Sequence, residues 1–343
     1  MVLYPDNPNR IQRVHDLGND IAGYQDEIRS QNSKQKESDT RAYDTLGEIA
    51  KMKKYSSPEE YVDAAIKAMP EAERQKFQKL REEITKTGKN GETILFVTGA
   101  VATLGLVGRV ILTEKGLKVM SSISSWVSGL RASATSIELS MAGAASEANS
   151  FAELGEEAFK GAEEFTFGEV AVSEGSIAAE GVGEVSTLVK LGRFASRAAV
   201  VLAILATIGD LIYEGVEGKK QMDKCQKWTK ELCAKRLMVY KMKENVETAF
   251  SFMSKIYGLL EFEKMVREDE DIPADKKEIK IQKKIKEVAE AFGRLPAPVD
   301  ATVYGSLKIK DENAHSWTNE DPHLQEMQQY LKDMAAGKIK PEE

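Results

Sequence analysis

The stretch VYKMKENVETAFSFMSKIYGLL, residues 239–260, decides the fold class of this 343-residue chain. Its apolar side chains recur at steps of three and four residues, which places them on one face of a helix. Those side chains are Val239, Met242, Val246, Phe250, Met253, Tyr257 and Leu260. Because this stripe continues for about three heptads, the segment is predicted to be a long amphipathic helix.

The same period occurs in two other parts of the chain. One stripe comprises Ile11, Val14, Leu17, Ile21, Tyr24 and Ile28, and a basic segment nearer the C-terminus carries Ile281, Ile285, Val288 and Phe292. The sequence SSPEE adds a helix start, with Ser57 as N-cap, Pro58 at the first helical position and Glu60 three residues after the cap. Since no series of short strand-like runs separated by turns occurs, we expect an all-α fold, an elongated bundle of long amphipathic helices.

Two apolar runs interrupt this soluble pattern. ILFVTGAVATLGLVGRVILT, residues 94–113, has no charge before Arg109 and would be about 30 Å long as a helix, which matches the hydrocarbon core of a bilayer. AAVVLAILATIGDLIY, residues 198–213, would span about 24 Å and contains Asp210, so alone it is short and polar for a membrane helix. Taken singly, either run is also explained as a buried central helix of a bundle.

Charge is distributed unevenly around these runs. Residues 141–187 hold ten glutamates against Lys160, a net charge of −9, whereas residues 219–243 hold nine lysines and arginines against two acids, a net charge of +7. A basic block attracts anionic headgroups by about 1 kcal/mol per Lys or Arg, although a solvated helix face would have the same composition. The whole chain carries a net charge of −7, which argues against nucleic acid as a partner.

Motifs typical of enzymes are missing from the sequence. It contains no HExxH, CxxC, Walker-type or GxSxG motif. His315 and His323, near Asp321, are better explained by a solvated polar tail than by a metal site. Cys225 and Cys233 would lie about 12 Å apart along one helix, too far for a disulfide, so both are predicted to be free thiols. We therefore expect a protein that is not an enzyme, with no cofactor and no metal.

The layout as a whole resembles the α-helical pore-forming toxins of the cytolysin A type, a group that includes multi-component bacterial haemolysins. The resemblance covers roughly residues 10–290 and is carried by the apolar runs 94–113 and 198–213 between long amphipathic helices. It implies a soluble monomer that folds an apolar hairpin away in a head, then opens and oligomerises into a ring. The 84-residue segment between the runs is longer and more acidic than a tight hairpin needs. LATIGDLIYEGVEGKKQ, residues 205–221, also resembles the apolar-then-basic segment of the apolipoprotein L group.

Four parts follow from these patterns. We predict N-terminal amphipathic helices in residues 1–91, a central apolar and acidic membrane-interacting region in 92–216, basic amphipathic helices in 217–292 and a polar tail in 293–343. The predicted membrane-insertion residues are Ile94, Leu95, Phe96, Val97, Val101, Leu104, Leu106, Val107, Val110 and Ile111 in the first run, and Val200, Val201, Leu202, Ile204, Leu205, Ile208, Leu211 and Ile212 in the second. The predicted headgroup-binding residues are Lys219, Lys220, Lys224, Lys227 and Lys230.

The predicted function is permeabilisation of a lipid membrane with anionic headgroups by a homo-oligomer, with or without a companion subunit. The sequence MVLYPDNPNRIQRV has no apolar signal-peptide core, so we expect synthesis in the cytoplasm, release by another route and membrane association when active. The alternative is a soluble α-helical coiled-coil scaffold or interaction protein whose apolar runs are only buried core.

Overall fold

The computed structural model describes residues 4–67, 71, 74–75, 132, 135–136, 139, 150, 218–292, 298–335 and 338–339. Its helices are α1 (Asn7–Met52), α2 (Pro58–Lys67), α10 (Gly218–Glu268), α11 (Ala274–Phe292), α12 (Asp300–Asn313) and α13 (Leu324–Ala335). No strand occurs in these ranges, so the prediction of an all-α chain is confirmed for them. The apolar runs 94–113 and 198–213, with every predicted insertion residue, lie outside the described residues.

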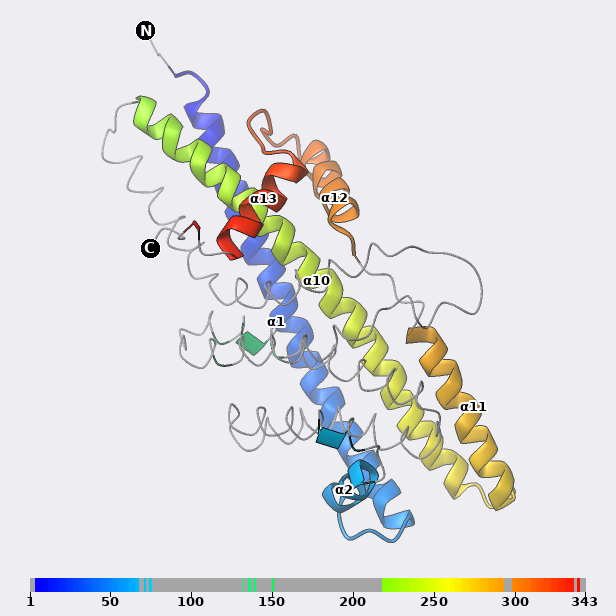
Figure 1. Ribbon diagram of the computed structural model, residues 1–343. Coiled ribbons are helices and arrows are strands. Elements are labelled where there is room, and N and C mark those ends of the chain that lie inside the picture. The colour runs from blue at the N-terminus through cyan, green and yellow to red at the C-terminus, as the bar shows by residue number, and fades with distance from the viewer. Residues whose placement is uncertain are drawn as a thin grey trace.

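Helices α1 and α10 lie side by side and run in the same direction (Figure 1). At their first turns, the side-chain amide of Asn7 donates a hydrogen bond to the carbonyl oxygen of Gly218, at 2.9 Å. A Cβ atom at Gly218 would lie 2.7 Å from the ring of Tyr4, so a larger residue here would force that ring to move. Near the other end, the Lys264 ammonium pairs with the carboxylate of Glu48. With a rise of 1.5 Å per residue, the 46 residues of α1 extend for about 69 Å.

The predicted apolar stripes of these two helices are buried in one shared core. Each of the seven stripe residues in 239–260 is at most 8% exposed, and the N-terminal stripe is buried from Val14 to Ile28 with Ile11 partly buried at its edge. Full burial of one large aliphatic side chain contributes about 1.5–3 kcal/mol, so the pairing is driven mainly by these contacts.

The middle of α1, residues 29–41, is polar on all sides in the sequence but does not interrupt the helix. Asn32, Gln35 and Asp39 are buried there, and none is more than 5% exposed. The Asp39 carboxylate accepts hydrogen bonds from the Gln35 amide, at 3.0 Å, and from the hydroxyl of Tyr257 on α10. Since a buried carboxylate is tolerated when donors surround it, this stretch forms a polar layer inside the interface.

Helix α2 begins as the sequence predicts. The hydroxyl of Ser57 accepts a hydrogen bond from the main-chain N–H of Glu60 at 3.2 Å, and Pro58 is the first helical residue. The Glu60 carboxylate accepts a hydrogen bond from the main-chain N–H of Ser56, at 2.7 Å, rather than from that of Ser57. The cap is therefore a capping box shifted by one residue on its carboxylate side.

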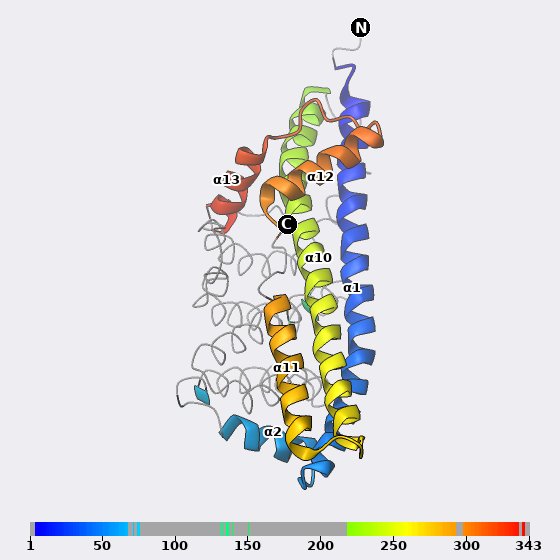
Figure 2. The ribbon, with the colours of Figure 1, turned by 90° about the vertical axis from the view of Figure 1, so that its right-hand side faces the viewer.

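The remaining helices cover α10 at its two halves (Figure 2). Helix α11 runs back along the last part of α10 and buries Ile281, Ile285 and Val288, as its predicted stripe requires. Helix α12 crosses α10 and α1 nearer their first turns, and α13 follows it against α10. Among the described helices, none is both long and apolar enough to cross a membrane.

Candidate functional site

The five predicted headgroup-binding lysines occupy the first turns of α10, and all five side chains are exposed. On an ideal helix, Lys219, Lys220, Lys224, Lys227 and Lys230 fall within an arc of about 140°. Their helix buries its other side, where Cys225, Trp228, Thr229 and Leu232 lie in the core. Asp223 is also exposed within this arc, so the surface carries five positive charges and one negative charge. We call it the lysine surface.

The rest of the basic block, residues 231–243, is not part of this surface. Lys235, Arg236 and Lys241 are each at most 7% exposed. Lys235 pairs with Glu231 one turn away, at 2.5 Å, and half-buried Lys243 lies 3.2–3.4 Å from carboxylates of α1 and α10. Although the sequence shows one block with a charge of +7, its exposed positive charge is confined to residues 219–230.

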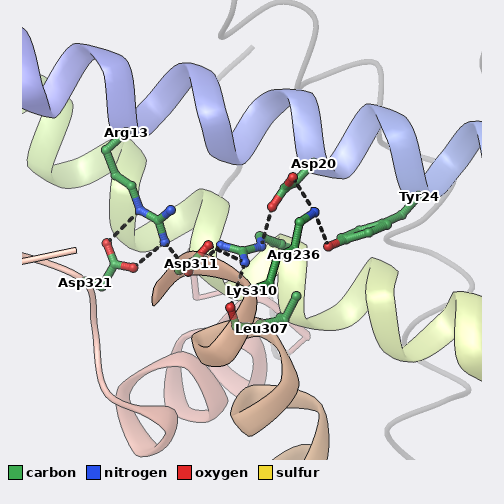
Figure 3. A network of polar contacts seen from close by, with 8 residues as sticks. All are labelled: Arg13, Asp20, Tyr24, Arg236, Leu307, Lys310, Asp311 and Asp321. Carbon is green, nitrogen blue, oxygen red and sulfur yellow. Dashed lines mark hydrogen bonds and ion pairs between the residues drawn. The ribbon is translucent and has the colours of Figure 1, made fainter. Parts of the chain in front are cut away.

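Arg236 is held by helix α12, whose inner face carries Val303, Leu307 and Asp311 at intervals of four residues. The Arg236 guanidinium donates two parallel hydrogen bonds to the Asp311 carboxylate, at 2.8 and 2.9 Å, and a third to the carbonyl oxygen of Leu307, at 3.3 Å (Figure 3). Such a bidentate pair fixes both the position and the orientation of the two groups.

The Asp311 carboxylate also binds a side chain of helix α1. Arg13, which is 1% exposed, donates hydrogen bonds to Asp311 at 2.8 Å and to Asp321 at 2.5 and 3.1 Å (Figure 3). Asp321 reaches this position because His315, with φ of 51°, ends α12 in the left-handed region and the Ser316 N–H bonds back to the carbonyl of Asp311. Because Asp311 of α12 binds both Arg13 and Arg236, it joins α1 to α10.

Further ion pairs extend this network in both directions. Asp20 of α1 lies 3.0 Å from Arg236 and 2.6 Å from Lys310, and the Lys310 ammonium donates to the hydroxyl of Tyr24 at 2.8 Å (Figure 3). Toward the start of α1, Arg10 pairs with Glu320 at 2.5 Å and lies over the ring of Trp317. At the start of α12, Asp300 accepts hydrogen bonds from Lys241 at 2.7 Å and from Gln328 at 2.8 Å.

The surroundings keep these groups charged. Burial favours the protonated form of Asp311, but hydrogen bonds from Arg236 and Arg13 outweigh burial and hold its pKa below the ordinary value. The same balance, with Lys241 and Gln328 as donors, lowers the pKa of Asp300. The hydrogen bond from Arg10 lowers the pKa of Glu320 against a smaller opposing effect of burial. Asp311, Asp300 and Glu320 are therefore ionised at neutral pH.

Both cysteines are free thiols, as predicted, and both are buried. Burial raises the pKa of Cys225 to about 11, and it raises the pKa of Cys233 as well. The charge of Glu320 also raises the pKa of Cys225, and those of Asp321 and Asp311 raise the pKa of Cys233.

The network was not anticipated from the sequence, which indicated only a polar tail after residue 292. A faint signal was present, because Arg13 continues the stripe of Leu17 and Ile21, and Asp311 continues that of Val303 and Leu307. A charge on the extension of an apolar stripe points to a buried ion pair, although not to its partner.

Within the ranges that the structure describes, no group of three or more His, Cys, Asp or Glu side chains is arranged to hold a metal ion. Comparisons with protein-family models, with curated proteins and with solved structures find no match to this chain.

Proposed function

We propose that this chain is a membrane-binding, pore-forming protein that is soluble first, then exposes an apolar helical hairpin and oligomerises to permeabilise a bilayer. In this proposal the helices form an elongated bundle, and residues 92–216 form its membrane-inserting head. One observation carries the proposal. The lysine surface begins at Lys219, six residues after the apolar run 198–213 ends, and its five lysines are exposed, whereas Lys235, Arg236 and Lys241 of the same basic block are buried.

This arrangement suits attachment to an anionic bilayer. Each lysine near an anionic surface contributes about 1 kcal/mol, and the attraction fades within a Debye length of about 8–10 Å. Positive charge beside an apolar run would therefore hold that run at the headgroups, from where its side chains can enter the hydrocarbon.

A soluble helical scaffold is the second candidate, and the α1–α10 interface favours it. The two helices lie side by side from Asn7 and Gly218 at their first turns to Glu48 and Lys264 near their ends, as the strands of a coiled coil do. In that case residues 94–113 and 198–213 would serve as core for the same kind of packing.

Dye release from vesicles separates the two candidates. The test variant replaces the five residues of the lysine surface with Gln, and the control replaces five exposed lysines elsewhere, namely Lys276, Lys280, Lys283, Lys286 and Lys308. Both variants lower the net charge by five, from −7 to −12, so total charge is matched.

We expect wild type and control to release dye from anionic vesicles and the test variant to bind them more than tenfold more weakly, since losing even two contacts removes about 2 kcal/mol. Wild-type protein that releases no dye from vesicles of either charge would favour the scaffold. Equal binding by both variants would remove the lysine surface from the proposal.

A further inference from the structure

We propose that residues 298–335 form an acidic clasp over a latent cationic surface of α1 and α10, and that anionic lipid headgroups displace this clasp and bind in its place. The clasp comprises α12, the turn that follows it and α13. This inference rests on the proposed membrane function and adds a means of regulating it.

The charges of the clasp match those that it covers. Four cations of the paired helices, each at most 7% exposed, have carboxylate partners on the clasp. The pairs are Arg10 with Glu320, Arg13 with Asp311 and Asp321, Arg236 with Asp311, and Lys241 with Asp300. Removing the clasp would take these carboxylates away from all four cations.

One uncovered cation would extend the lysine surface directly. Lys241 lies eleven residues beyond Lys230 on α10, about 16 Å along the helix, and falls within the same arc on an ideal helix. Arg236 lies outside that arc and shares the Asp311 carboxylate with Arg13 of α1. Asp20 would remain with Arg236 and neutralise part of the charge. The exposed lysines would thus make the first contact, and the covered cations would enlarge it.

Lipid phosphate is the occupant that this surface fits. Arg13 and Arg236 hold carboxylates through paired N–H groups, and the same planar fork fits two oxygens of a phosphate. Lys241 falls within the arc of the lysine surface on an ideal helix, and that surface begins six residues after an apolar run, which suits a bilayer.

The clasp is also lightly attached compared with the helices beneath it. Its fully buried apolar side chains are Val303, Leu307, Met327 and Met334, and Tyr304, Leu324, Tyr330 and Leu331 pack against the core while partly buried. Its helices have 14 and 12 residues, lengths at which an isolated helix is marginal in water. Displacement should therefore expose the backbone amides of the clasp to solvent exchange, whereas α1 and α10 stay protected by their shared core.

Two native thiols report on the clasp without any substitution. The carboxylate of Glu320 raises the pKa of Cys225, and those of Asp321 and Asp311 raise the pKa of Cys233. If the clasp leaves, both thiols lose these carboxylates and should react faster with a soluble maleimide.

The first experiment uses the unaltered full chain with vesicles of phosphatidylcholine, with and without phosphatidylglycerol. We expect the phosphatidylglycerol vesicles alone to raise, severalfold, both the labelling rate of the cysteines and the hydrogen exchange of residues 298–335. Exchange in 298–335 that stays unchanged on protein shown to be vesicle-bound by sedimentation would overturn the inference.

The second experiment compares Glu320→Gln with Glu312→Gln. The first removes the partner of Arg10, whereas Glu312 is exposed on the outer side of α12, so each variant loses one charge from the same segment. Glu320 lies at the edge of the network, so this variant leaves Arg13 and Arg236 paired with Asp311 and Asp321. We expect Glu320→Gln to bind anionic vesicles about two- to fivefold more tightly than wild type, because the clasp loses one partly exposed ion pair that opposes its displacement. Glu312→Gln should bind them as wild type does. Equal affinities for the two variants would count against the clasp.

Dye release then separates this inference from pore formation. A clasp that opens on vesicles from which no variant releases dye would leave the clasp standing and remove the pore. If wild type releases dye while the amides of residues 298–335 stay protected from hydrogen exchange, the pore would stand and the clasp would be overturned.

Discussion

The hydroxyl of Tyr257 donates a hydrogen bond to the carboxylate of Asp39, although the two residues are 218 positions apart in the chain. Both are buried, at 7% and 2% exposure, in the middle of the α1–α10 interface. This contact fixes the register of two long helices whose apolar stripes alone would tolerate sliding by one turn, because a displaced Asp39 would face apolar side chains.

Tyr257→Phe should therefore destabilise the fold by about 1–3 kcal/mol, because it removes one donor from a buried carboxylate without changing the ring. Urea unfolding followed by circular dichroism measures the change. Tyr304→Phe, on partly buried Tyr304 of α12, is the control and should stay within about 0.5 kcal/mol of wild type. Equal losses in the two variants would mean that the hydroxyl of Tyr257 has no special role.

Asp311→Asn should have a larger effect. Asp311 is the shared partner of Arg13 and Arg236, so neutralising it leaves two buried guanidinium groups with a weaker acceptor. Breaking a buried ion pair in this way costs about 3–5 kcal/mol. Urea unfolding at pH 7 should show a loss of this order for Asp311→Asn and almost none for Glu312→Gln, one residue along the same helix.

The advantage of wild type over Asp311→Asn should also depend on pH. The pKa of Asp311 is lower in the folded chain than its ordinary value near 3.9, so its charge stabilises the fold above about pH 4. That contribution is lost as the pH falls through the folded pKa. Unfolding free energies measured from pH 7 down to about pH 3 should converge for the two proteins, and a constant difference across this range would contradict the assignment.

Both native thiols should react slowly in the folded chain. A thiol with a pKa of about 11 is roughly 0.1% ionised at pH 8, whereas an ordinary thiol near 8.5 is about a quarter ionised. Burial adds to this effect, so labelling of Cys225 and Cys233 by a soluble aromatic disulfide should be at least about a hundredfold slower than in urea. Fast labelling of the folded chain would show that the region around the C-terminal segment opens without any ligand.

Leu104→Glu tests the first apolar run, which lies outside the described residues. A carboxylate near the middle of a bilayer costs several kcal/mol, so the variant should remain folded and soluble but lose dye release. The same substitution in a buried core would instead lower helicity and stability. Circular dichroism and dye release on one preparation distinguish the two outcomes.

The sequence was sufficient to predict the helices that pack through a regular stripe. The stripes at 11–28, 239–260 and 281–288 are almost wholly buried, and Pro58 begins α2 as its cap predicts. These features are local, because a period of 3.6 and a capping residue can be identified within one segment.

What the sequence did not reveal depends on partners far apart in the chain. Asn32, Gln35 and Asp39 look like a solvated face until Tyr257 lies opposite Asp39, and Asp311 looks like a surface charge until Arg13 and Arg236 meet it. The basic block shows the same limit, since composition cannot separate exposed Lys224 from buried Lys241. Burial of a charge is decided by which carboxylate reaches it, and here that carboxylate comes from residues 298–335.

The parallel pairing of α1 with α10 also bears on how the chain is synthesised. Asn7 and Gly218 are 211 positions apart, so at about 5–20 residues per second the start of α10 follows that of α1 by roughly 10–40 s. During that interval the apolar stripe of Leu17, Ile21 and Ile28 cannot pack against α10. Bringing together two segments so far apart in the chain also carries an entropic penalty that helices adjacent in sequence avoid. The pair should therefore assemble slowly for a helical protein, and the nascent α1 should be a target of ribosome-associated chaperones.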